Sequence, residues 1–274
     1  MLGVAERRVC RVLEVGRASV RRHADGPRHR VPRIDSVLAA RIDTLIHRHP
    51  TFGYRRLWAL LRFREGHQIT PKTVYRILRL KGWFVHQRPV TPRPRAQGRI
   101  SRAEQSDQRW AADLTHIFCG RDGWAHLAAV MDCHDRECIG YEFALRGRAR
   151  EAERALEEAC LGRFGTLRPE GPTPVVRSDN GLIYQSRRFR AACRDYRLHQ
   201  EFITPYTPEQ NGIIERFFRS LKEECVWQHV FASFEHARRE ISAWIRWYNE
   251  ERPHQALGYH SPREFRGQQL ERVA

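Results

Sequence analysis

The sequence lacks the features that would direct a chain out of the cytoplasm. It has no C-x-x-C pair, and its seven cysteines are odd in number, which argues for reduced thiols rather than a disulfide framework. The N-terminus carries Glu6, Arg7 and Arg8 without the apolar segment of a signal peptide. No apolar run approaches the length of a membrane span. We therefore expect a cytoplasmic protein with no membrane partner.

Negative charge is scarce in the first part of the chain. Residues 1–100 hold 23 Lys and Arg against 6 Asp and Glu, whereas residues 101–274 hold 26 of each, so the net charge of +17 comes entirely from the first hundred residues. Such a distribution predicts that the front of the chain binds nucleic acid. Lysine is rare, with 3 residues against 46 arginines. Arginine suits bidentate phosphate contacts, and a biased genome composition would give the same ratio.

A helix-turn-helix is predicted in this basic part. Apolar periodicity indicates helices over 34–47, between Gly53 and Gly66, and from Pro71 to Leu80, the last beginning at a threonine and a first-turn proline. A glycine-containing connection followed by a helix with polar donors on its outer face is typical of DNA-reading helices. A plain helical hairpin with a solvated basic face is the alternative. The residues predicted to contact DNA here are Arg55, Arg56, Lys72, Thr73, Arg76 and Arg79.

The remainder of the chain predicts an α/β domain. Strands are expected over 110–118, 124–131 and 138–145, followed by a helix over 150–164 and a strand at 175–178. A helix near 189–196, a strand near Phe202 and a last helix over 234–249 complete the pattern. We divide the chain into a basic N-terminal segment (1–33), a helix-turn-helix domain (34–85), a basic Pro/Arg linker (86–108), a catalytic core (109–265) and a tail (266–274).

One amphipathic helix of the second part carries a glutamate beside its apolar stripe. Thr207, Pro208 and Gln210 form a capping-box pattern, so we expect the helix to begin at Pro208. Glu215 borders the stripe and should lie between core and solvent, and Lys222 shares its face. The predicted stripe consists of Ile214, Phe217, Phe218 and Leu221.

Two aspartates on other elements are the predicted partners of Glu215. Asp113 lies inside an otherwise apolar strand, where a carboxylate is costly to bury unless it is paired or bound to metal. Asp179 lies at the end of a short strand, before an Asn-Gly turn. Three carboxylates on separate elements predict one converging site. Asp132 and Asp135 are competing candidates, although a strand-end or turn role is the simpler interpretation. Thr115, His116, Glu223 and Glu224 are interpreted as structural or surface residues.

The spacing of these residues resembles a known signature. Thirty-five residues separate Asp179 from Glu215, and a basic residue follows at Lys222. Together with Thr115, Asn180-Gly181, Tyr248-Asn249 and Arg252-Pro253-His254, this pattern resembles the DDE transposases of the family-three bacterial insertion elements (OrfB type) over residues 50–265. The resemblance implies a ribonuclease-H-like, integrase-type core. It also implies a phosphate contact by Lys222, double-stranded DNA as partner, a homo-oligomer on DNA, and an upstream-frame (OrfA) protein or fusion.

The chemistry of phosphodiester cleavage explains why three carboxylates would converge. Two divalent ions roughly 3.5 to 4 Å apart can activate the nucleophile and stabilise the leaving oxygen, and carboxylates suit Mg²⁺. We hypothesise that Asp113 bridges two Mg²⁺ (or Mn²⁺) ions, Asp179 binds one and Glu215 the other. The predicted function is metal-dependent DNA cleavage and strand transfer. The alternatives are a ribonuclease-H-like nuclease, and a DNA-binding repressor whose core is inactive.

Overall fold

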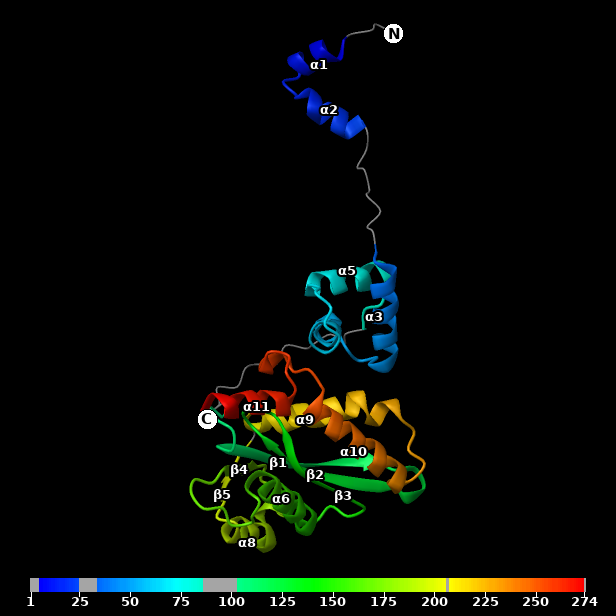
Figure 1. Cartoon of the computed structure of the whole chain (residues 1–274). Helices are drawn as coiled ribbons and strands as arrows, with labels where there is room; N and C mark the ends of the chain where they lie inside the picture. Colours follow the sequence, from blue (N-terminus) through cyan, green and yellow to red (C-terminus); the bar gives the residue numbers. More distant parts are fainter. Residues whose placement is uncertain (1–4, 25–33, 86–102, 206, 274) are drawn as a thin grey trace. The chain divides into compact units, whose positions relative to one another are not determined.

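The computed structural model describes residues 5–24, 34–85, 103–205 and 207–273 (Figure 1). Contacts along the backbone divide the chain into two units, Met1–Arg41 and Ile42–Ala274. The first unit contains α1 (Glu6–Val12), α2 (Arg17–Ala24) and the start of α3 (Ser36–Arg48). The Asp35 carboxylate accepts hydrogen bonds from the backbone N–H groups of Val37 and Leu38, so it caps the free N–H groups of the first turn of α3.

The second unit begins with the helices predicted to form the helix-turn-helix. α4 (Tyr54–Ala59) continues into a π-helical turn, η1 (Leu60–Arg64), and α5 spans Pro71–Lys81. The connection between them turns at Gly66, whose φ is +73°, and the Trp58 indole donates to the Ile69 carbonyl at 2.8 Å. The predicted inward residues are buried, namely Leu57, Leu60, Leu61, Val74, Ile77 and Leu78. Thr70 lies at the N-cap of α5 but makes no side-chain cap, contrary to the predicted N-cap role.

A five-stranded mixed sheet forms the centre of the α/β part. Its strands are β1 (Arg109–Phe118), β2 (Trp124–Asp132), β3 (Cys138–Ala144), β4 (Val175–Ser178) and β5 (His199–Phe202), in the order β3-β2-β1-β4-β5. β1, β2 and β3 are antiparallel neighbours, and β4 and β5 add in parallel beside β1. The predicted ribonuclease-H-like α/β class is confirmed.

Helices cover both faces of the sheet (Figure 1). α6 (Ala149–Phe164), α7 (Leu182–Gln185) and α8 (Arg187–Asp195) contribute to one buried cluster, which includes Trp110, Ala112 and Val176 of the strands. α9 (Gly212–Glu224) and α10 (Phe234–Glu250) contribute to the other, which includes Ala111 and Ile117. Because side chains alternate along a strand, the odd-numbered residues of β1 face α9 and α10.

The helix that carries Glu215 begins later than the capping-box pattern predicts. Residues Pro208–Asn211 form a 3-10 turn, η3, and α9 starts at Gly212. The Thr207 side chain caps no helix N–H. The Gln210 side chain instead bonds the backbone N–H and the hydroxyl of Thr204 at 2.8 and 3.1 Å. The prediction of a start at Pro208 is therefore wrong, because a contact within the preceding loop uses the side chain that the capping box requires.

The ends of the predicted core also differ from the structure. Residues 266–273 are not a tail, because they form the second half of helix α11 (Pro262–Val273), which packs against α10. The short turns η4 (Val226–Gln228) and η5 (Gln255–Leu257) flank α10. At the other end, residues 103–108 were predicted as linker but belong to the folded core. The backbone N–H of Asp107 donates a hydrogen bond to the Asp132 carboxylate, and the Ser106 hydroxyl donates one to the Asp135 carboxylate. The predicted linker residues 86–102 lie outside the described residues.

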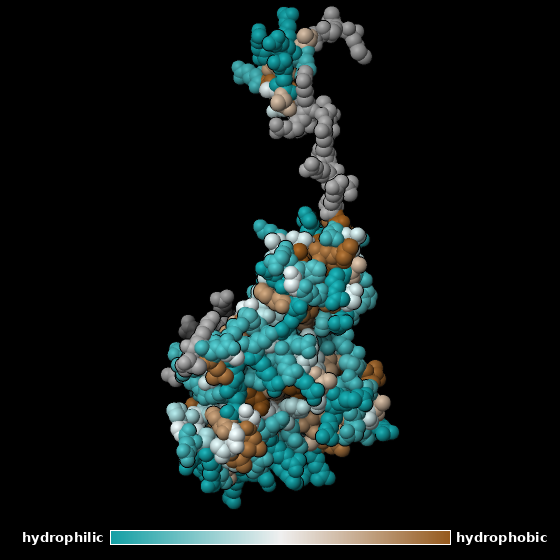
Figure 2. All heavy atoms as spheres, in the orientation of Figure 1, coloured by the Kyte–Doolittle hydropathy of each residue, from teal (hydrophilic) through white to brown (hydrophobic). Residues whose placement is uncertain are grey.

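The surface matches the charged composition. The face in Figure 2 is mostly hydrophilic, with hydrophobic residues scattered over it. All seven cysteines are buried and free, as the prediction of reduced thiols requires. Within the described residues, no helix is both long and apolar enough to cross a membrane.

Candidate active site

Asp113 lies on the face of β1 that α9 covers. Its neighbours on that face, Ala111 and Ile117, are fully buried in the cluster formed with α9 and α10. The Asp113 carboxylate is partly buried and accepts a hydrogen bond from the backbone N–H of Leu114 at 2.7 Å. His116 is exposed on the opposite face, where its ring meets that of His126 at 4.7 Å, as the alternation predicts.

Asp179 follows β4 directly, and β4 is the parallel neighbour of β1. Its carboxylate accepts a hydrogen bond from the backbone N–H of Gly181 at 2.9 Å, which fixes the turn after the strand. A Cβ atom at Gly181 would lie 2.9 Å from that carboxylate oxygen, closer than side chains tolerate. Glycine at 181 therefore makes room for the Asp179 carboxylate against the backbone.

Glu215 lies in the first turn of α9 and is exposed. Its predicted stripe is buried, with Ile214, Phe217 and Leu221 at most 1% exposed, and α9 contacts both β1 and β2. The N-terminal position suits a carboxylate, because the helix dipole is positive there. The packing of the stripe thus fixes the helix, while the carboxylate itself is accessible, further out than the predicted border position.

The pKa of Asp113 indicates that the three carboxylates lie near one another. The pKa of Asp113 is raised to about 7, by burial first and then by the charges of Asp179 and Glu215, against the lowering effect of the Leu114 N–H and of the Lys222 charge. Charges act on one another in this way only at short range. Asp113, Asp179, Glu215 and Lys222 therefore share one neighbourhood, although they come from three different elements.

The three carboxylates are the kind of ligand that a divalent cation binds, but their side chains are not close enough together to hold one ion in this structure. Hard oxygen donors are what Mg²⁺ takes, and a carboxyl group with a pKa of about 7 beside two other carboxylates would be stabilised in its charged form by a cation. Within the part of the chain that the structure describes, no three His, Cys, Asp or Glu side chains are close enough to hold one ion. The oxygen donors therefore suit a divalent cation by their chemistry.

Comparison with known proteins gives two kinds of match along the chain. Two family models described as integrase core domains match residues 103–208 and 196–262, and one described as an HTH-like domain matches residues 33–89. The chain is 33% identical over 242 residues to the transposase InsD of insertion element IS2A/D/F/H/I/K of Escherichia coli, covering 84% of this chain and 78% of the relative. The chain belongs to the IS3-family DDE transposases.

One further transposase and two solved structures are similar to this IS3-family chain. The transposase InsD of element IS2-9 of Escherichia coli strain K12 is 33% identical, over 84% of this chain and 77% of the relative. The catalytic core of BIV integrase is 19% identical with a TM-score of 0.43, covering 61% of this chain and 98% of that one. A chain of the simian T-cell lymphotropic virus intasome with a PP2A regulatory subunit is 19% identical with a TM-score of 0.48, covering 83% and 74%.

The predicted DNA-contact residues of this transposase-family chain fall into two groups. Lys72, Arg76 and Arg79 are exposed along α5 and Thr73 is half-buried beside them, so they form one polar face. Arg55 is exposed and bonds the Tyr54 hydroxyl. Arg56 differs from the outward position predicted for it. It is half-buried and donates to the Glu224 carboxylate at 2.9 Å, so its charge is engaged within the protein.

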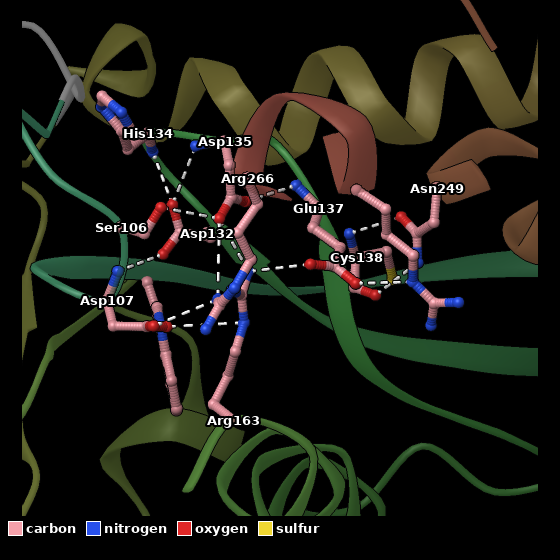
Figure 3. A network of polar contacts seen from close by, with 12 residues as sticks. Ser106, Asp107, Asp132, His134, Asp135, Glu137, Cys138, Arg163, Asn249 and Arg266 are labelled. Atoms are coloured by element: carbon pink, nitrogen blue, oxygen red, sulfur yellow. Dashed lines mark hydrogen bonds and ion pairs between the residues drawn. The ribbon is translucent and has the colours of Figure 1, made fainter. Parts of the chain in front are cut away.

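The competing acidic residues of the IS3-family chain are held in a separate network (Figure 3). Asp132 is fully buried and accepts from the backbone N–H groups of Asp107, His134 and Asp135 at 2.6 to 3.0 Å. Burial, then the charge of Asp135, raises the pKa of Asp132 to about 7. Asp135 is fully buried and bonds Arg163 at 2.9 Å. These contacts agree with the interpretation of both as strand-end and turn residues.

Three residues near the carboxylates carried no signal in the sequence. Arg177 is 2% exposed and joins β4 to β5 and to the segment before α9. Tyr184 is 3% exposed, and its hydroxyl has no hydrogen-bond partner among the described residues. Burial, then the charges of Asp113 and Asp179, raises the pKa of Tyr184. Glu224, interpreted as a surface charge, is buried against Arg252 at 2.6 Å, so that interpretation is wrong. In a sequence with so many arginines, the few that are buried and paired cannot be recognised, because most arginines in proteins are exposed.

Proposed function

We propose that this IS3-family chain cuts DNA strands at the ends of an insertion element and joins them to target DNA. The proposal rests on one observation above the rest: β1, which carries Asp113, is the parallel neighbour of β4, which leads to Asp179, and packs against α9, which carries Glu215. The relatives that match most of the chain are named transposases of insertion elements, which supports the same activity.

In this proposal Asp113, Asp179 and Glu215 hold two Mg²⁺ or Mn²⁺ ions. Such ions activate an oxygen nucleophile and stabilise the leaving oxygen at the phosphorus. The protein's part is to hold the carboxylates. Asp113 is fixed by the central strand, Asp179 by its bond to Gly181, and Glu215 by the buried stripe of α9. Lys222, close enough to act on Asp113, would hold a DNA phosphate beside them.

Substitution of the three carboxylates tests this assignment. Asp113→Asn, Asp179→Asn and Glu215→Gln should each abolish cleavage and strand transfer on a duplex carrying the element end, with Mg²⁺ present. Duplex binding should persist, because the proposed DNA contacts are made by basic side chains and not by these carboxylates. Glu223→Gln, which removes a half-exposed charge from the same helix as Glu215, serves as the matched control. Full cleavage in any one of the three variants would remove that residue from the site.

We propose the polar face of α5 as the element that binds the DNA duplex. Lys72, Thr73, Arg76 and Arg79 lie along one exposed side of a helix whose other side is buried, an arrangement suited to a DNA groove. Arg76→Gln and Arg79→Gln should each weaken duplex binding and lower its salt dependence by about one phosphate contact. Unchanged affinity in both would favour the plain helical hairpin.

The proposal extends to the setting in which the chain acts. We expect a homo-oligomer assembled on DNA in the bacterial cytoplasm, with the upstream-frame protein or its fusion as a further partner. A repressor with an inactive core would bind the element end and never cut it, while a general nuclease would cut without joining. Incubating the purified chain with element-end DNA and Mg²⁺, then resolving cut and joined products, separates these outcomes.

A further inference from the structure

A basic cavity lies beside the helix that carries Glu215. Its volume is about 380 Å³. Its walls come from α4, from α9 and from the loop after α10. Along these walls the structure describes no Asp or Glu. Five arginines line it: Arg55, Arg56, Arg136, Arg216 and Arg252.

Two of the five guanidinium groups, those of Arg252 and Arg56, are held in place by the protein. Arg252 is 3% exposed and forms two bonds to Glu224, at 2.6 and 2.7 Å, and it lies over the Tyr248 ring at 5.4 Å. Arg56 donates to the same glutamate and lies over the Phe52 ring at 5.0 Å. Because their rotamers are fixed, an anion entering the cavity would meet an ordered set of donors.

Positive charge exceeds negative charge around the cavity. Glu224 is the carboxylate that both Arg56 and Arg252 contact. Burial, then the charge of Arg252, lowers the pKa of Arg56 despite Glu224, and Arg216 lowers it further. His254, 3.4 Å from Arg252, has a pKa lowered by burial and then by Arg252, Arg56 and Arg136. The pKa of Arg252, by contrast, is raised by its bonds to Glu224, against the effect of burial, so Glu224 compensates Arg252 more than it compensates Arg56.

The cavity is adjacent to the proposed active site along the chain. Arg216 follows Glu215 directly on α9, and Ile213, Phe217 and Ser220 of the same helix line the cavity. At 3.6 residues per turn these residues lie about 100° to 200° around the helix from Glu215, so the cavity opens on another face of α9 than the Glu215 carboxylate does.

We propose that this cavity binds a phosphodiester group of the DNA backbone, with Arg216 and Arg136 as direct contacts beside the buried Arg252. The site would anchor a DNA strand beside α9, on a face of the helix away from the Glu215 carboxylate, so the inference rests on the proposed function. Arginine forks match phosphate oxygens in bidentate geometry, and no neutral or cationic ligand would be favoured by five guanidinium groups.

Duplex binding without metal tests this proposal separately from catalysis. A fluorescent duplex would be titrated in EDTA, at several salt concentrations, with the full natural chain and with its variants Arg216→Gln, Arg136→Gln and Arg216→Lys. The two glutamine variants should each lose several-fold in affinity and lower the salt slope by about one, while Arg216→Lys keeps the slope. Arg154→Gln is the matched control, since Arg154 of α6, the helix on the other face of the sheet, pairs with Glu142 of β3.

The outcomes distinguish the cavity from the rest of the proposed function. If Arg76→Gln weakens duplex binding and Arg216→Gln and Arg136→Gln do not, the cavity is not a DNA contact, whereas DNA binding through α5 stands. If none of these variants weakens binding, the proposed DNA-binding function itself fails. A second arm measures the melting temperature with inorganic pyrophosphate at matched ionic strength. Stabilisation that Arg216→Gln abolishes, without any effect on duplex binding, would assign the cavity to free phosphates and overturn the DNA role.

Discussion

The guanidinium of Arg177 donates a hydrogen bond to the backbone carbonyl of Gln210 at 3.0 Å. The same side chain makes two bonds to the Glu201 carboxylate, at 3.1 and 3.2 Å, and is 2% exposed. Arg177 lies two residues before Asp179, and Gln210 lies five residues before Glu215. One buried side chain thus links the strand that ends at the second carboxylate to the segment that leads into the helix of the third.

Replacement of Arg177 should therefore affect both stability and activity. Arg177→Gln removes hydrogen bonds to a charged partner, so we expect the free energy of unfolding to fall by about 1.5 to 3 kcal/mol. The cleavage rate should fall by more than the loss of folded protein explains, because the segment before α9 loses its hydrogen bond to β4. Urea unfolding and a cleavage assay at a temperature where the variant is folded measure the two effects. Arg188→Gln, on the exposed side of α8, should change neither appreciably; equal losses in both variants would contradict this role of Arg177.

The raised pKa of Asp113 predicts a pH dependence of stability in EDTA. Burial and the neighbouring carboxylates raise its pKa to about 7 in the folded chain, whereas the unfolded value is about 3.9. Between these values the folded state binds more protons than the unfolded state, so stability falls as pH rises from about 4 to about 7. Asp113→Asn cannot ionise and avoids this loss.

Urea titrations of both proteins across this pH range measure the effect. The advantage of Asp113→Asn over the natural chain should grow from about pH 4 to about pH 7 and then stay constant. Mg²⁺ should reduce that advantage near neutral pH, since a cation favours the ionised carboxylate. A difference in the free energy of unfolding between the two proteins that does not vary with pH would show that burial does not raise the pKa of Asp113. Glu235→Gln, a carboxyl group with a 73% exposed side chain, supplies the control.

The sequence predicted the elements of the site well because their signals are local. The stripe of α9 and the alternation of β1 follow from periodicity over about two turns or a few residues, and Ile214, Leu221 and Ile117 are buried as expected. The order of strands and helices follows from the same local patterns. The spacing between Asp179 and Glu215 added the family resemblance that the comparisons confirm.

The features that escaped prediction depend on partners far away in sequence. Glu224 looks like a surface charge beside Lys222, yet its partners Arg56 and Arg252 lie 168 and 28 residues away. The start of α9 is a local exception, because Gln210 contacts Thr204, six residues before it, instead of completing the capping box. A network around Asp132 and Asp135 recruits Asp107 and Arg266 from segments interpreted as linker and tail. Local composition carries no information about such pairings.

Glycine at 181 should matter for catalysis more than for folding. Its φ of −65° suits any residue, so Gly181→Ala brings no backbone strain. The added Cβ would instead approach the Asp179 carboxylate at 2.9 Å and displace it. We expect cleavage to fall about 10- to 100-fold, as for other small misplacements of a catalytic group, with the free energy of unfolding changed by less than about 1 kcal/mol.

A second glycine provides the contrast for Gly181. At Gly162, inside α6, a Cβ would meet only the Ile139 carbonyl at an ordinary 3.8 Å, so Gly162→Ala should stabilise the helix by about 0.5 to 1 kcal/mol and leave cleavage unchanged. Comparable cleavage by both alanine variants would mean that Asp179 does not need its position against the Gly181 backbone.

The buried ion pair between Glu224 and Arg252 should dominate the stability of the region after α9. The two side chains are 6% and 3% exposed and make contacts at 2.6 and 2.7 Å, and Arg56 shares the glutamate. Glu224→Gln leaves two guanidinium groups without their counter-charge. Breaking a buried pair from one side costs about 3 to 5 kcal/mol, and we expect a loss of that size in urea unfolding with an unchanged slope.

Substitution of the neighbouring Glu223 separates the effect of burial from the effect of losing a charge. Glu223→Gln removes the same charge one residue earlier, but its side chain is 40% exposed and pairs with the 63% exposed Arg219, so the change should stay within about 0.5 kcal/mol. Because Glu224 faces Arg56 of α4 as well as Arg252, the loss in Glu224→Gln should shrink when Arg56→Gln is added, since one uncompensated charge is then removed. Additive losses in the double variant would mean that Arg56 and Glu224 do not interact in solution.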